Sequence, residues 1–251
     1  MSESTAARRG PSLLRRLVAP VAATALLAGA TGLWAAGAAH SAPAAGARTA
    51  AAFGDCPELP QGVDPARWRC EVHTSAPELT IGKVVLTLAP ITMTHAEGPM
   101  PDGTNGQVWG AMHSAPTAVP GGLSGTPAGG HAPAQGLAIR PEYGGRSDFY
   151  TGALSLRFRL LSPVLPRGCA IGASEPVDFR AKRSGPSKWV SQEPPVIEFS
   201  AYDDAFTAPA PEHCGPLTGL LGRRLGLPAA TGNLLSYDAS YTFRTYDRSQ
   251  H

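Results

Sequence analysis

Apolar and polar residues alternate along much of the second half of the chain. From Leu154 to Leu160 every second residue is large and apolar, and most residues between them are polar. A period of two is typical of a β-strand with one face in a core. Other stretches with the same period are 177–179, 197–199 and 237–245. The second half therefore predicts several half-buried strands.

The first half shows the same pattern less regularly. A short strand is predicted at "WRCEVHT", and residues 78–95 alternate apolar with small or threonine side chains, interrupted by Gly82 and Pro90. We interpret 78–95 as two strands, because β-branched residues at period two favour strands over a helix. Residues 98–136 are rich in glycine and proline, so we expect mostly loop there. Within them, Asn105-Gly106 predicts a tight hairpin turn followed by a strand through Met112.

One stretch has helical rather than strand spacing. In "GPLTGLLGRRLG", Leu217, Leu220, Leu221 and Leu225 lie on one face of a helix, which Gly226 can end with a left-handed residue. We expect this helix to direct its leucines at a sheet and to cover one end of the domain. The predicted fold is all-β: a β-sandwich, immunoglobulin-like or related, with one short helix and long Gly/Pro-rich loops.

The N-terminus has the layout of an export signal. Arginines at positions 8, 9, 15 and 16 precede an uncharged apolar run over 17–39, followed by small residues. We predict a signal peptide over 1–44, a disordered tether over 45–54 and a single β-sandwich domain over 55–251, with a loop insertion at about 98–136. A retained N-terminal anchor remains the alternative to cleavage, and both Sec and twin-arginine export are open.

Removing this leader changes the charge balance. The whole chain has 21 basic and 19 acidic residues; the leader holds four arginines and Glu3, which leaves 17 basic and 18 acidic residues. The densest basic stretch, 180–188, is short and interrupted by glycine and proline, and it predicts a solvated turn. Nucleic-acid binding needs clustered positive charge. We therefore expect no nucleic-acid partner, and membrane contact only through an uncleaved leader.

All four cysteines follow the predicted leader. An even number in an exported chain predicts two disulfides, for which three pairings are possible. The spacing favours the sequential pairing, Cys56 with Cys70 and Cys169 with Cys214, because each pair then lies inside its own segment. A zinc site is the alternative, but no two cysteines lie two to four residues apart. We expect no metal and no other cofactor.

Three blocks of the second half resemble a known group of sequences. They are "LSLRFRLLSPVLPRGCAIG", "AYDDAFTAPAPEHCGP" and "RLGLPAATGN", which contain in order C-x-I-G, D-x-F-x-x-P, C-G and G-L-P-x-x-x-G-N. These blocks look like those of a group of uncharacterised secreted actinobacterial proteins. The resemblance covers about 154–233 and implies export, a β-rich fold and a Cys169–Cys214 bond. Because the group has no assigned activity, it implies no catalytic residues.

The candidate chemistry lies mainly in histidines and nearby carboxylates. His95 and Glu97, with His73 and His113 on other predicted strands, are the best candidates for a metal or acid–base site, although no H-x-H or H-E-x-x-H spacing occurs. We interpret Asp203 and Asp204 as a turn, because adjacent strand residues point to opposite faces.

Tryptophans 68, 109 and 189 and tyrosines 143, 150 and 202 are a possible platform for a glycan or lipid, but aromatic residues on strands are more often core. The sequence alone favours a secreted or cell-surface module without enzymatic activity that binds an envelope component, glycan or lipid. A secreted hydrolase around His95 and Glu97 and a lipid-binding sandwich remain the alternatives. A cavity between the sheets would favour the last of these.

Overall fold

The structure is a computed structural model of the whole chain, and it describes residues 53–125 and 136–247. All of these belong to one compact unit, Pro43–His251. The predicted signal peptide and almost all of the predicted tether lie outside the described residues. Within the described part, no helix is long and apolar enough to span a bilayer.

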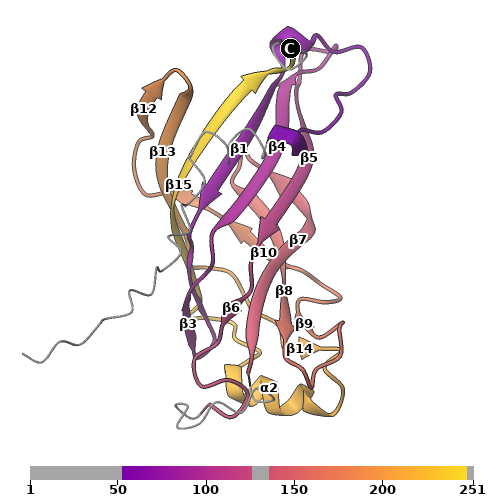
Figure 1. Cartoon of the computed structure of the whole chain (residues 1–251), viewed down its shortest axis with the longest axis vertical. Coiled ribbons are helices and arrows are strands. Elements are labelled where there is room, and N and C mark those ends of the chain that lie inside the picture. Colours follow the sequence, from indigo (N-terminus) through magenta and orange to yellow (C-terminus); the bar gives the residue numbers. More distant parts are fainter. Residues whose placement is uncertain (1–52, 126–135, 248–251) are drawn as a thin grey trace, which may run out of the picture. The chain divides into compact units, whose positions relative to one another are not determined.

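The described strands form two antiparallel sheets (Figure 1). The nine-stranded sheet has the order β11-β13-β15-β1-β4-β5. In addition, β12 pairs with β13, and β2 pairs with both β15 and β3. Its strands are β1 (Arg69–Ser75), β2 (Glu78–Ile81), β3 (Val84–Thr87), β4 (Ile91–Pro99), β5 (Asn105–Ser114), β11 (Lys182–Arg183), β12 (Lys188–Gln192), β13 (Pro195–Asp203) and β15 (Leu234–Thr245).

The six-stranded sheet has the order β14-β9-β8-β7-β6, with β10 paired to β8. Its strands are β6 (Thr117–Ala118), β7 (Ala138–Asp148), β8 (Ala153–Leu161), β9 (Ala170–Ile171), β10 (Val177–Arg180) and β14 (Pro211–Glu212). The helices are the single-turn 3-10 helices η1 (Phe53–Asp55), η2 (Pro65–Arg67) and η4 (Gly215–Leu217), and the α-helix α2 (Thr218–Leu225).

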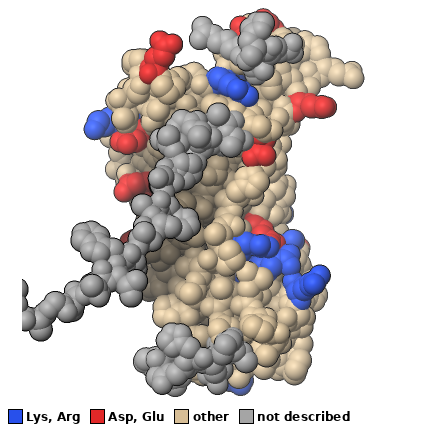
Figure 2. Space-filling view, viewed as in Figure 1, with Lys and Arg blue, Asp and Glu red and all other residues tan. Residues whose placement is uncertain are grey.

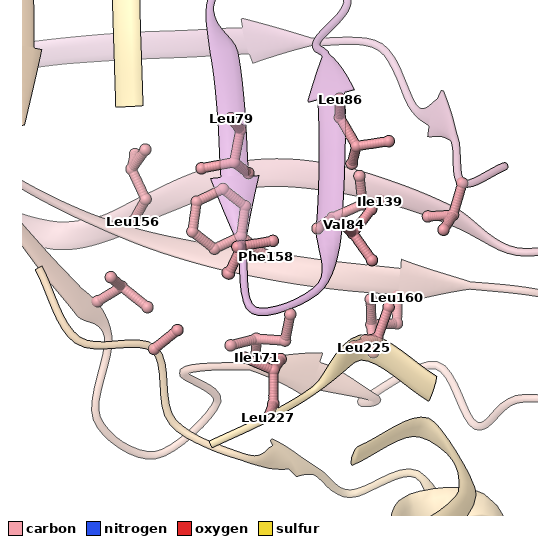
Figure 3. Packing of buried hydrophobic residues seen from close by; sticks show 14 of the residues in the cluster. Leu79, Val84, Leu86, Ile139, Leu156, Phe158, Leu160, Ile171, Leu225 and Leu227 are labelled. Carbon is pink, nitrogen blue, oxygen red and sulfur yellow. The ribbon is translucent and has the colours of Figure 1, made fainter. Parts of the chain in front are cut away.

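The core lies between these two sheets, so the fold is the β-sandwich that the alternation predicts. Leu156, Phe158 and Leu160 of β8 are each at most 3% exposed. They pack with Leu79, Val84 and Leu86 of the β2–β3 hairpin, with Ile139 and Ile171, and with Leu225 and Leu227 near the helix (Figure 3). Residues from both halves of the sequence therefore build one apolar core.

Residues 78–95 form parts of three strands, so the prediction of two was wrong. Gly82 lies in the β2–β3 turn with φ of +58°, and a Cβ there would lie 2.3 Å from the carbonyl oxygen of Leu225. The next residue, Lys83, donates its backbone N–H to the same oxygen over 2.8 Å. The turn thus contacts the end of α2, and only glycine fits its closest point.

The turn between β4 and β5 also differs from the prediction. It comprises 100–104, with Gly103 at φ of +82°, and the Asp102 carboxylate accepts the backbone N–H of Thr104 over 2.9 Å. Asn105 and Gly106 lie within β5, paired with Pro99 and Gly98. The expected strand through Met112 is present as β5, but an Asp-x-Thr turn precedes it. The two-residue strand β6 also lies in the stretch 98–136 that was expected to be mostly loop, and residues 126–135 of that stretch lie outside the described residues.

The short helix lies at the end of the sandwich near β9 and β14 (Figure 1). Leu221 and Leu225 are buried as expected, whereas Leu220 is 40% exposed, because a helix of two turns directs only one narrow stripe inward. Gly226 ends the helix in the left-handed conformation, with φ of +71°. The predicted helical covering is present with a narrower apolar face.

Both disulfides have the sequential pairing. Cys56 bonds Cys70, with Cα atoms 5.8 Å apart, and Cys169 bonds Cys214, with Cα atoms 4.4 Å apart. The second bond joins the segment before β9 to the residue preceding η4 and α2. These four are all the cysteines of the chain, and none is free. Two such bonds are typical of an oxidising environment outside the cytosol.

Candidate functional site

A polar cluster lies on the inner face of the nine-stranded sheet, where the alternation would favour apolar residues. Strands β1 and β4 are antiparallel neighbours whose register places Glu71 opposite His95 and Arg69 opposite Glu97. Residues two apart on a strand share a face, so E-x-H in β1 (Glu71, His73) lies against H-x-E in β4 (His95, Glu97). The inner face thereby brings two histidines and two carboxylates together.

The carboxylate of Glu71 is at the centre of this cluster. Its Oε2 lies 3.1 Å from Nε2 of His73 and 3.8 Å from Nε2 of His95. Nε2 of His95 is also 3.5 Å from Oε2 of Glu97. Glu71, His73, His95 and Glu97 are all buried, and His95 is only 1% exposed. The structure therefore brings together three of the four residues predicted as a site, and adds Glu71.

Arg69 neutralises part of this buried charge. Its Nε is 2.6 Å from Oε1 of Glu71 and 3.0 Å from Oε1 of Glu97, and its Nη2 also contacts the Glu97 oxygen. One guanidinium therefore binds the Oε1 atoms of both carboxylates. Their Oε2 atoms remain directed at the two imidazoles.

Aromatic rings hold both imidazoles in place. Phe149, in the turn between β7 and β8 of the other sheet, stacks on His95 with ring centroids 3.7 Å apart and planes 4° from parallel. Tyr241 of β15 stacks on His73 at 4.9 Å. The backbone N–H of Phe149 donates to Oε1 of Gln107 over 3.0 Å. Stacking and this hydrogen bond thus connect the two sheets at the cluster.

The surroundings shift the pKa of two cluster residues. Burial lowers the pKa of His73 below its ordinary value, and this outweighs its hydrogen bond to Glu71, so the ring is neutral at pH 7. Burial alone would raise the pKa of Glu97, but the nearby His95 imidazole and the Arg69 guanidinium lower that pKa to about 2. Glu97 is therefore a permanently charged carboxylate and a weak base.

A cavity of about 360 Å³ lies next to the cluster. Its apolar wall comes from both sheets, with Ile91 and Leu235 on one side and Leu156 and Phe179 on the other. Arg69, Glu71, His73 and Glu97 also line it. This volume lies at the lower end of the range of small-molecule sites, about 300–1,000 Å³. The space is thus mostly apolar with a charged region in its wall.

His113, the fourth predicted site residue, does not join the cluster. Its side chain on β5 is 64% exposed, and its Nε2 lies 2.8 Å from a carboxylate oxygen of Asp55. This partner belongs to η1, near the start of the described chain. His113 is a surface residue with a local ion-pair partner.

The other candidates have structural roles or remain separate. Asp203 is buried and accepts the backbone N–H groups of Arg180 and Ala205, whereas Asp204 is exposed and pairs with Lys182. Asp203 therefore binds backbone N–H groups as expected, but it does so as the last residue of β13. The six aromatic residues do not form one platform, because some are buried and others are exposed. Trp68 is 0% exposed, whereas Tyr150 is 52% and Trp189 50% exposed. Trp109 stacks on Tyr143.

Three residues of the site were not predicted from the sequence. Arg69, Glu71 and Phe149 have no recognised motif around them, and the sequence contains no H-x-H or H-E-x-x-H spacing that would mark a site near them. The signal that could have found Glu71 is the pair of motifs E-x-H and H-x-E. In each motif the two residues are two positions apart, so they share one face of a strand. Phe149 had no sequence signal, since its position depends on how the sheets pack.

Comparison with protein-family models, curated proteins and solved structures finds no match for this chain.

The charged side chains on the surface add one observation. On the face shown in Figure 2, the visible Lys and Arg side chains lie in small groups among a largely uncharged surface, with acidic side chains interspersed.

Proposed function

We propose that the protein is a secreted or cell-surface binding module that holds a small, mainly apolar molecule with a polar end between its two sheets. The observation that supports this is the 360 Å³ cavity inside the sandwich. Protein interiors are normally close-packed, with few voids larger than a water molecule. A space of this size in a disulfide-braced domain is better explained by an occupant than by poor packing.

The chemistry of the wall defines the class of ligand. Leucine, isoleucine and phenylalanine side chains from both sheets line a space that suits the apolar body of a ligand. Arg69 supplies N–H donors, and Glu71, Glu97 and Tyr241 supply oxygen atoms, for the polar head of that ligand. A lipid-like molecule with both parts fits this arrangement, and a nucleic acid does not.

The proposed location is supported by separate observations. Two disulfides favour an oxidising compartment. The arginine-flanked apolar run at the N-terminus favours export. The resemblance to secreted actinobacterial proteins points the same way, and membership of that group remains part of this proposal.

A secreted hydrolase is the second candidate, because His73, His95 and Glu97 meet beside the cavity. Efficient acid–base catalysis requires a group whose pKa is near the working pH. Glu97, with a pKa of about 2 and its Oε1 bound by Arg69, is far from that condition. The binding function is therefore the better supported of the two.

Filling the cavity tests the proposal. Ala201 and Ala239 both line the cavity and are 3% and 8% exposed, so Ala201→Leu and Ala239→Leu place added volume inside it. Ala66 is exposed in η2, and Ala66→Leu is the matched control. The probe is an environment-sensitive naphthalene sulfonate dye, followed by its displacement with a straight-chain fatty alcohol.

We expect saturable dye binding by the wild type, weakened at least about tenfold by each cavity substitution, which corresponds to about 1.4 kcal/mol. Ala66→Leu should bind as the wild type does. Absence of saturable binding, or equal binding by all folded variants, would refute the proposal. Turnover of an aryl ester that disappears in His95→Asn would instead support the hydrolase.

A further inference from the structure

The buried residues Glu71, His73 and His95 form a group whose hydrogen bonding is incomplete. One ligand atom of each lies within 4.8 Å of the others. Among the described residues, neither ring nitrogen of His95 has a hydrogen-bond partner, although the side chain is 1% exposed. Buried polar atoms are nearly always satisfied. An unsatisfied imidazole directed at a carboxylate and a second imidazole therefore indicates a ligand.

We propose that Glu71, His73 and His95 bind a zinc ion, through Oε2 of Glu71 and Nε2 of each histidine. Two histidines and one glutamate are a typical ligand set for zinc with an open fourth position. Bonds of about 2.0–2.2 Å in a tetrahedron place neighbouring ligand atoms about 3.3–3.6 Å apart. The Glu71 oxygen lies 3.1 Å from the His73 nitrogen and 3.8 Å from the His95 nitrogen. Side-chain shifts of a few tenths of an ångström bring both distances into that range.

The local charge also favours a cation. Two buried carboxylates, Glu71 and Glu97, face a single guanidinium, that of Arg69. The carboxylates outnumber the guanidinium, and burying charge without a partner is costly. A divalent ion between the Oε2 atoms and the imidazoles compensates it. Arg69 binds the opposite, Oε1, side of each carboxylate and leaves the inner oxygens accessible to the metal.

The surrounding contacts meet the requirement for outer-shell support. Metal ligands are held by neighbours that fix their orientation. Here Arg69 orients the Glu71 carboxylate, Phe149 stacks on His95 and Tyr241 stacks on His73. The three ligands come from two paired central strands, which are more rigid than loops. These neighbours therefore hold the three ligand side chains close together in the absence of an ion.

The proposed zinc site borders the cavity, but zinc binding does not require the cavity to hold a ligand. Glu71 and His73 line the cavity, as does Glu97. Oε2 of Glu97 is 3.5 Å from the His95 nitrogen and is within reach of the fourth position. Zinc binding goes beyond the proposed binding of an apolar molecule, and either can be present without the other.

The test measures zinc binding by the untagged, disulfide-bonded protein after chelator treatment. Zinc content is determined by mass spectrometry after equilibrium dialysis, and cobalt(II) reports the coordination geometry through its visible absorption. The variants are Glu71→Gln, which keeps the shape of the side chain, and His95→Asn. The matched control is His113→Asn, since His113 is a histidine outside the cluster with its own carboxylate partner.

We expect one zinc per chain and a tetrahedral cobalt spectrum for the wild type and for His113→Asn. Glu71→Gln and His95→Asn should each weaken zinc binding at least about tenfold, because loss of an outer-shell group alone costs that much. Circular dichroism and the intact mass establish that each variant is folded and oxidised; if His95→Asn fails to fold, Glu71→Gln decides.

Two results would overturn the zinc proposal. One is the absence of stoichiometric zinc, and the other is zinc binding that survives in Glu71→Gln but is lost in His113→Asn. Dye binding by the metal-free protein is measured in parallel. Saturable dye binding without zinc binding leaves the proposed function standing, and the reverse result leaves only the zinc site.

Discussion

At the scale of single residues, Arg69 pairs with both buried carboxylates of the cluster, Glu71 and Glu97. Its guanidinium is the cation nearest to two buried carboxylates, although 42% of its own side chain is exposed. Removing one partner of a buried ion pair costs more than the pair contributes, because the other charge remains buried and uncompensated. The exposure of Arg69 reduces that cost through solvent screening.

We therefore predict that Arg69→Gln lowers the free energy of unfolding by about 2 kcal/mol, between the values for exposed and fully buried pairs. Urea unfolding followed by fluorescence measures this. The control is Arg146→Gln, since Arg146 and its partner Asp178 are both more than half exposed. Its effect should stay below about 1 kcal/mol. Equal effects of the two substitutions would contradict the role given to Arg69.

At the scale of elements, the β2–β3 turn and the end of α2 depend on each other. Gly82 has a positive φ and lies against the carbonyl oxygen of Leu225, and Lys83 hydrogen-bonds that same oxygen. Gly226, which ends the helix, packs closely on Lys83. An eight-residue helix is too short to be stable alone, so this contact, together with its buried leucines, holds it in place.

Gly82→Ala tests this dependence. The added Cβ would lie 2.3 Å from a backbone oxygen, in addition to the strain of a positive φ. Gly103→Ala is the matched control, because Gly103 has φ of +82° and nothing within 4 Å of its would-be Cβ. We expect Gly103→Ala to cost about 1 kcal/mol and Gly82→Ala about 3 kcal/mol or more. Thermal unfolding measures both, and equal shifts would show that the contact is unimportant.

At the scale of the whole molecule, the two disulfides constrain different lengths of chain. Cys56 and Cys70 are 14 residues apart, and Cys169 and Cys214 are 45 apart. In the chain-entropy model the longer loop gives the larger stabilisation, about 4 kcal/mol against about 3 kcal/mol. The Cys169–Cys214 bond, which closes the longer loop, also fixes the segment that leads into α2.

We expect the double substitution Cys169→Ala/Cys214→Ala to lower the free energy of unfolding by about 4 kcal/mol, and Cys56→Ala/Cys70→Ala by about 3 kcal/mol. Guanidinium unfolding of the oxidised proteins measures the difference. A smaller loss for the longer loop would mean that native contacts around α2 compensate for the missing bond.

The sequence predicted the fold well because its main signals are local. Alternation along β8 and β15, the helical spacing before Gly226 and the even number of cysteines each report a nearby structure. The errors were also local: Gly82 was not recognised as a hairpin turn, and Asp102-Gly103 was overlooked in favour of Asn105-Gly106. A turn type depends on φ values that several adjacent glycines can supply equally well.

The site was predicted only in part because it depends on strand pairing. His73, His95 and Glu97 were found as residue types, but the register that places Glu71 opposite His95 joins strands far apart in sequence. Phe149 reaches His95 from the other sheet, which no spacing rule describes. His113 was included on the assumption that histidines of different strands converge, whereas η1 supplies it with Asp55 instead.

The pairing of β1 with β4 limits how this protein can change through insertion or deletion. Cys70 and Glu71 are consecutive residues on opposite faces of β1, with the disulfide on one side and the polar cluster on the other. Loss or gain of one residue before Glu71 would turn the carboxylate outward and point an apolar neighbour at the imidazoles. Related chains can therefore vary in length at the turns, while within these strands the cluster can change only by exchange of one side chain for another.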